Sequence, residues 1–71
     1  MNSTTHQPVE VEREVFEGIE AVRQSGLANM FHRDCVAEIA SELGFYASAD
    51  WMRENPGLYP RAIIRGVEVT E

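Results

Sequence analysis

His32 and Cys35 come closest in type and spacing to a catalytic pair. They are three positions apart, so they would share one helical turn, and a helix N-terminus lowers the pKa of a thiol. Such a pair could supply a cysteine nucleophile and a histidine base. Because the sequence offers no third residue to orient the histidine and no oxyanion donor, we interpret Cys35 as a half-buried thiol beside a surface histidine. We predict no catalytic residue and no enzyme activity.

The same segment contains oxygen ligands for a metal, in Asp34 and Glu38. With one cysteine and two histidines in 71 residues, no set of ligands closes at a recognised spacing. We therefore predict no metal site and no cofactor, and we identify no small-molecule substrate. A single cysteine also excludes an internal disulfide, and with it a disulfide-stabilised secreted scaffold.

The charge balance argues against a nucleic-acid partner. Twelve acidic residues face six arginines, and the formal net charge is −6, whereas DNA is bound by clustered lysines and arginines. Residues 33–43 and 49–55, joined by a short turn, loosely imitate a helix-turn-helix, but the second helix would carry Asp50 and Glu54 against Arg53. A helix-turn-helix-like DNA-binding regulator is therefore kept only as the alternative function.

Hydrophobic spacing predicts the helices that position these residues. The first covers about residues 10–25 and ends at Gly26, and its buried face is formed by Val11, Val15, Ile19 and Val22. The second covers about residues 33–43, between His32 as N-cap and Gly44. Phe31 and Val36 would form a hydrophobic staple at its start. Met30 and Phe31 are strongly apolar, so the connection at residues 27–31 should pack inward. An acidic stripe lies on its opposite side, at Asp34, Glu38 and Glu42.

Two shorter helices are predicted in the second half of the chain. One covers about residues 49–55, with Ser48 as its N-cap. The other covers about residues 56–65, and it either kinks at Pro60 or starts late with Pro60 in its first turn. Residues 67–71 alternate apolar and polar side chains, which indicates a short extended tail.

These elements predict an all-α fold, a compact domain of three to four helices with little or no sheet. Residues 9–71 form this single domain, and the polar residues 1–8 precede it as a disordered leader. We find no internal repeat. No targeting segment and no apolar run long enough to span a bilayer is seen, so we expect a cytoplasmic protein.

Several segments together resemble a family of short uncharacterised proteins, a domain of unknown function found in phages, archaea and bacteria. They are VFEGIEAVRQSG (residues 15–26), NMF (29–31), ELGF (42–45), Trp51, Leu58-Tyr59 and RAIIRG (61–66). The resemblance implies a compact helical unit and often a viral or mobile-element origin, so the protein is plausibly phage-encoded and would then act in the host cytoplasm. It implies no activity and no catalytic residue.

An interaction surface is predicted near the C-terminus. The adjacent Ile63 and Ile64 cannot both face one helical stripe, so one of them should point outward. Arg61 and Arg65, four positions apart, would flank Ile64, with Tyr59 nearby, and arginine beside aliphatic and aromatic anchors is enriched at protein interfaces. The predicted interface residues are Tyr59, Arg61, Ile64, Arg65 and Val67. Because no enzyme site is found, we predict a small non-catalytic accessory protein that binds another protein or itself as a homodimer.

Overall fold

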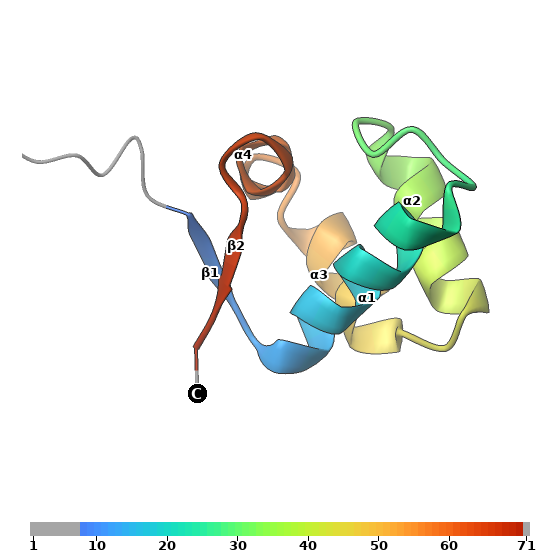
Figure 1. The fold of residues 1–71 in the computed structure, drawn as a ribbon, viewed down its shortest axis with the longest axis horizontal. Coiled ribbons are helices and arrows are strands. Elements are labelled where there is room, and N and C mark those ends of the chain that lie inside the picture. Colours follow the sequence, from blue (N-terminus) through green and yellow to red (C-terminus); the bar gives the residue numbers. More distant parts are fainter. Residues whose placement is uncertain (1–7, 71) are drawn as a thin grey trace, which may run out of the picture.

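The structure, a computed structural model, describes residues 8–70, so the predicted leader at residues 1–8 lies almost entirely outside it. Four helices and a two-stranded parallel sheet follow in the order β1, α1, α2, α3, α4, β2 (Figure 1). Their bounds are β1 Val9–Val11, α1 Arg13–Ser25, α2 Arg33–Glu42, α3 Tyr46–Glu54, α4 Leu58–Arg65 and β2 Val67–Val69. The prediction of three to four helices in a small compact unit is confirmed, but the fold is mostly α rather than all-α.

One hydrophobic core joins the helices to the first strand. The predicted apolar face of α1 is buried, and it meets residues from α2, α3 and α4. The buried hydrophobic residues are Val11, Val15, Ile19, Val22, Val36, Ala37, Ala40, Ala49, Met52, Tyr59 and Ala62. The small residues among them allow the helices to approach each other closely, which matters in a domain of this size because little apolar surface is available for burial.

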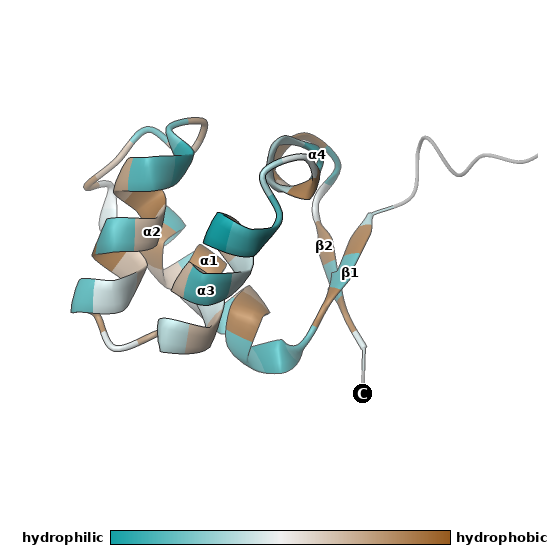
Figure 2. Ribbon diagram, turned by 180° about the vertical axis from the view of Figure 1, so that it is seen from behind, coloured by the Kyte–Doolittle hydropathy of each residue, from teal (hydrophilic) through white to brown (hydrophobic). Residues whose placement is uncertain are grey.

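The sheet corrects the prediction for both ends of the chain. The first helix begins at Arg13 rather than near Glu10, because Val9-Glu10-Val11 forms a strand. The expected extended tail pairs with it in parallel, in the register Val9 to Val67 and Val11 to Val69. Both strands have the triplet Val-Glu-Val, which Figure 2 shows as alternating hydropathy. This short repeat was not identified from the sequence. Val11 suits a helical stripe and a strand equally well, which is why spacing alone misplaced it.

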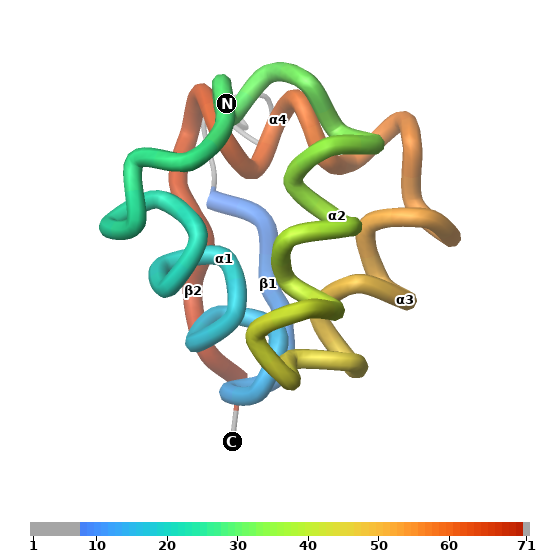
Figure 3. The backbone as a smooth tube through the Cα atoms, turned by 90° about the vertical axis from the view of Figure 1, so that its right-hand side faces the viewer, coloured from blue at the N-terminus to red at the C-terminus, as the bar shows by residue number. Residues whose placement is uncertain are grey.

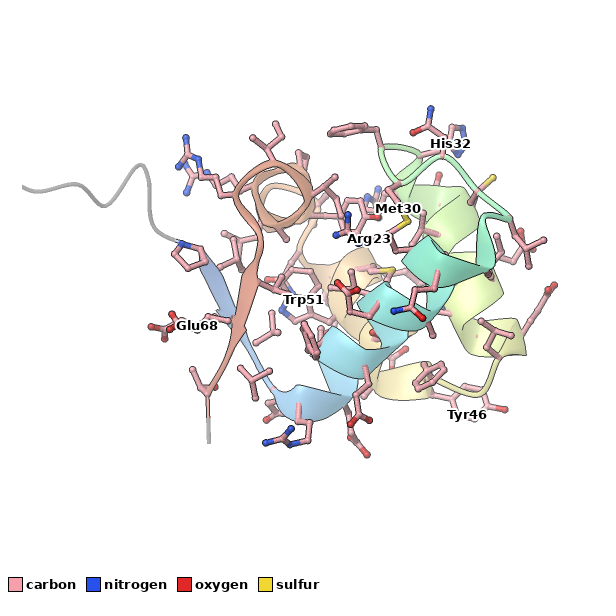
Figure 4. All side chains as sticks on the ribbon, viewed as in Figure 1. Arg23, Met30, His32, Tyr46, Trp51 and Glu68 are labelled. Carbon is pink, nitrogen blue, oxygen red and sulfur yellow. The ribbon has the colours of Figure 1, made fainter. Side chains whose placement is uncertain are left out.

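Alternation gives the sheet an inner and an outer face. Val9 and Val67 on the inner face are half-buried, whereas Glu10 and Glu68 are paired side by side and exposed. Glu68 points away from the helices in Figure 4. Figure 3 shows the two strands running alongside each other, with α4 across one end of them. A two-stranded sheet is marginal by itself, so packing on the helices must hold it in place.

Helices α1 and α3 cross closely at Gly18 and Ser48. A Cβ atom placed on Gly18 would lie 2.2 Å from Ser48 Oγ and 2.3 Å from Ser48 Cβ, so no side chain fits there. The fully buried Ser48 hydroxyl donates a hydrogen bond to the Val15 carbonyl oxygen at 2.6 Å. Ser48 is therefore not the predicted N-cap, because α3 begins earlier, at Tyr46, and the serine connects two helices instead.

The turn between α2 and α3 explains the early start of α3. Gly44 has a left-handed backbone with a φ of 93°, as predicted for the residue that ends α2. Its N–H donates to the Ser41 carbonyl at 3.0 Å, and the Phe45 N–H donates to the Ala40 carbonyl at 2.8 Å. This pair of bonds is the Schellman arrangement, and it reverses the chain at once into α3.

Helix α4 begins at Leu58, later than residue 56. The Asn55 carbonyl accepts hydrogen bonds from the Leu58 and Tyr59 N–H groups at 3.1 and 3.0 Å. Pro60 thus lies in the first turn, where its missing N–H costs no helical hydrogen bond. Of the two predictions for Pro60, the late start is confirmed.

Substitution Gly18→Ala should lower the free energy of unfolding by about 1–3 kcal/mol, because the added methyl group forces α1 and α3 apart. The higher helix propensity of alanine, up to about 1 kcal/mol, acts in the opposite direction and should not compensate. Urea denaturation followed by circular dichroism measures the difference.

Gly57→Ala is the matched control, since nothing lies within 4 Å of a Cβ atom at Gly57. It should change the stability by less than about 1 kcal/mol. The double variant Gly18→Ala with Ser48→Gly places the glycine on α3 instead of α1, so the added methyl group has room. It should recover part of the lost stability. Equal effects of the two alanine substitutions would show that the crossing is looser than described.

Candidate interaction site

Helix α4 is amphipathic, and its outward face has three of the residues predicted for an interface. Ala62 is buried and Ile63 packs against the core, so Ile64 points outward and is 70% exposed. Arg61 and Arg65 are exposed on the same helix. Val67 follows in β2 and packs against the core, so it does not belong to this outward face as predicted. The expectation that one of the paired isoleucines faces solvent is confirmed. We call Arg61, Ile64 and Arg65 the α4 patch.

The prediction that Tyr59 belongs to the interface is wrong, because Tyr59 lies in the core and is 1% exposed. Its hydroxyl donates a hydrogen bond to the Met30 carbonyl oxygen at 2.6 Å. Burial raises the pKa of Tyr59 to about 12, and the positive charge of Arg23 opposes this rise. Arg23 and Met30 are labelled in Figure 4. Tyr59 therefore attaches α4 to the connection between α1 and α2.

That connection packs inward only in part, because Phe31 does not follow the prediction. Leu27 is 68% exposed and Phe31 62% exposed, so no hydrophobic staple forms with Val36. Ala28 and Met30 are half-buried and pack against the core. The Phe31 N–H donates to Asn29 Oδ1 at 2.9 Å, a local turn that leaves the phenylalanine ring outside. Backbone and side-chain hydrogen bonds, rather than apolar anchors alone, fix this loop.

His32 and Cys35 lie together at one surface hollow. Both are exposed, so Cys35 is less buried than expected, and with Glu38 and Ile39 they line a hollow of about 340 Å³. Among residues 8–70, no group of three or more histidine, cysteine and acidic side chains is placed to hold a metal ion.

A second hollow, which sequence analysis missed, lies between β1 and α3. It has a volume of about 360 Å³ and is lined by Glu10, Val11, Glu12, Val15, Ala47, Asp50, Trp51, Glu54 and Thr70. Figure 2 shows α3 and the strands on this side of the molecule. We call it the acidic hollow, because its four carboxylates are exposed and no arginine lines it. The signal in the sequence was the acidic pair Asp50 and Glu54 around Trp51, but only the strand brings Glu10 and Glu12 to them.

The α2–turn–α3 pair matches the alternative helix-turn-helix prediction in connectivity only. The exposed side chains of α3 include Asp50 and Glu54 as well as Arg53. Asp34, Glu38 and Glu42 are also exposed on α2, as the acidic stripe predicted. A surface with this charge repels phosphates, so the geometry gives the DNA-binding alternative no support.

The chain belongs to the family described as a domain of unknown function (DUF5049), whose model matches residues 11–67. This match confirms the resemblance, and it spans all four helices. Neither the curated proteins nor the solved structures contain a match for the chain. Within the described residues, no helix has the length and apolar character needed to cross a membrane.

The buried phenol predicts loss of stability at alkaline pH. Its pKa is about 12 in the folded protein and about 10 when the chain is unfolded, so deprotonation favours unfolding. The stabilisation is complete below pH 10 and should disappear as the pH rises from 10 to 12. Thermal melts across this range should show the fall for the wild type.

Tyr59→Phe should abolish this component of the pH dependence. At neutral pH it should lower the free energy of unfolding by about 0.5–1.5 kcal/mol, because the hydrogen bond to Met30 is lost. Tyr46→Phe is the control, since Tyr46 is 66% exposed, and it should keep the wild-type pH profile. An unchanged profile in Tyr59→Phe would contradict the assigned role of the tyrosine.

Proposed function

We propose that this protein is a small non-catalytic, phage-encoded accessory factor, which binds another protein or a second copy of itself through the α4 patch. The observation that carries the proposal is the exposed Ile64 between Arg61 and Arg65. A cytoplasmic location and a phage origin stay predictions.

The composition of the patch supports this proposal. An aliphatic side chain with arginines beside it combines an apolar anchor with donors that can pair with carboxylates, and such combinations are enriched at interfaces. Residues 55–67 include Arg61 and Arg65 and no acidic residue, so the patch is locally positive in a protein of net charge −6. A partner surface with apolar and acidic groups would match it.

Ile64→Asp tests the proposal. The substitution introduces a charge where the partner would contact an apolar side chain, so binding should weaken by at least about 30-fold, equivalent to a loss of about 2 kcal/mol. Affinity capture from a lysate of the natural host cells, followed by titration of the captured protein, measures partner binding. Analytical ultracentrifugation measures self-association.

Leu27→Asp is the matched control, because Leu27 is exposed to a similar extent, 68% against 70%, and lies in the connection after α1. It should leave association intact, as should Cys35→Ser. Thermal melts must show that Ile64→Asp stays folded. An unfolded variant would place Ile64 in the core, and a folded variant with undiminished association would show that the α4 patch is not the interface.

A further inference from the structure

Charge is distributed unevenly over this small surface. All twelve acidic residues lie outside residues 55–67, so the α4 patch is a positive area in an otherwise acidic chain. The acidic hollow has the opposite character, with the carboxylates of Glu10, Glu12, Asp50 and Glu54 around half-buried Trp51. The two surfaces of one molecule are therefore complementary in sign, and each combines charge with apolar groups.

We propose that the α4 patch of one copy docks into the acidic hollow of a second copy. The inference rests on the proposed function and names the partner as the chain itself. Ile64 would lie against Trp51, while Arg61 and Arg65 would pair with the surrounding carboxylates. Arginine also stacks favourably on a tryptophan face, which gives the hollow a second way to hold the patch.

The alternative self-contact, in which two α4 patches meet about a two-fold axis, is disfavoured by charge. It would bring four guanidinium groups together around the two Ile64 side chains, and like charges repel at such distances. Docking of the patch into the hollow instead brings the two guanidinium groups against carboxylates, so unlike charges meet. Repulsion thus selects the unlike contact over the symmetric one.

When the α4 patch of one copy fills the acidic hollow of another, the pair still has one free hollow and one free patch. Such heterologous association continues head to tail, and it produces either a closed ring or an open filament. Because the pairing groups are exposed, the assembly should weaken as salt rises, since the screening length is about 10 Å at 0.1 M and about 3 Å at 1 M ionic strength.

Two complementary variants test the head-to-tail arrangement. The first, Arg61→Ser with Ile64→Ser, removes the patch without adding acidic groups and keeps the hollow. The second, Asp50→Arg with Glu54→Arg, removes the hollow and keeps the patch. In sedimentation velocity at low salt, the wild type should form species larger than a dimer, and each variant alone should be monomeric. A one-to-one mixture should form a dimer and nothing larger, since it has one intact contact.

The control is Glu38→Arg with Glu42→Arg, which makes the same charge change on the exposed stripe of α2 and should leave assembly intact. A wild type that stays monomeric, or a variant mixture that stays monomeric, would overturn head-to-tail docking. If the wild type is monomeric while its capture of another protein still depends on Ile64, only the self-docking is wrong. If assembly persists in the patch variant, the self-docking is wrong, and if capture of another protein is also undiminished in Ile64→Asp, so is the proposed role of the α4 patch.

Discussion

The close crossing of α1 and α3 is the contact on which the rest of the fold depends. At Gly18 there is no room for a side chain, and the facing Ser48 must satisfy its buried hydroxyl, which it does on the Val15 carbonyl oxygen. An unpaired hydroxyl in this position would cost more than the hydrogen bond gains. Steric fit and hydrogen bonding therefore specify the same arrangement of the two helices.

The position of the acidic hollow follows from this crossing. Two residues at the crossing also line the hollow. Val15 on α1 accepts the hydrogen bond from Ser48, and Ala47 on α3 directly precedes Ser48. Since β1 enters α1 directly, the crossing also fixes where Glu10 and Glu12 approach Asp50. Helix α4 is attached through Tyr59, which bonds to the Met30 carbonyl, and through β2, which pairs with β1. A wider crossing would change the hollow without altering any residue that lines it.

The sequence predicted the helices well because their periodicity and their glycine stops are local signals. Gly26 and Gly44 have the left-handed backbone expected of them, and α2 begins at Arg33 as expected. The sheet was not predicted, because three residues per strand give a weak pattern and the pairing partner is more than fifty residues away. Ser48 was wrongly predicted as an N-cap, because the sequence does not distinguish a serine that caps a helix from one that connects two helices.

The candidate site was predictable in part for the same reason. That one of Ile63 and Ile64 must face outward follows from helix geometry alone, and it was right. The burial of Tyr59 depends on a hydrogen bond to Met30, 29 positions earlier in the chain, which no local rule reveals. The acidic hollow likewise exists only once β1 lies against α3, so its carboxylates are scattered in the sequence and adjacent in the structure.

Folding of a single copy explains the inward residues of α4 but not Ile64. Tyr59 and Ala62 are buried, and Ile63 packs against the core, so the helix is fully attached by its other face. A chain with a polar residue at position 64 would fold equally well and would expose less apolar surface. Single exposed apolar residues are ordinary in proteins, but this one lies between two of only six arginines in a chain of net charge −6. The proposed docking would explain these residue types, because a second copy would cover the α4 patch with its acidic hollow.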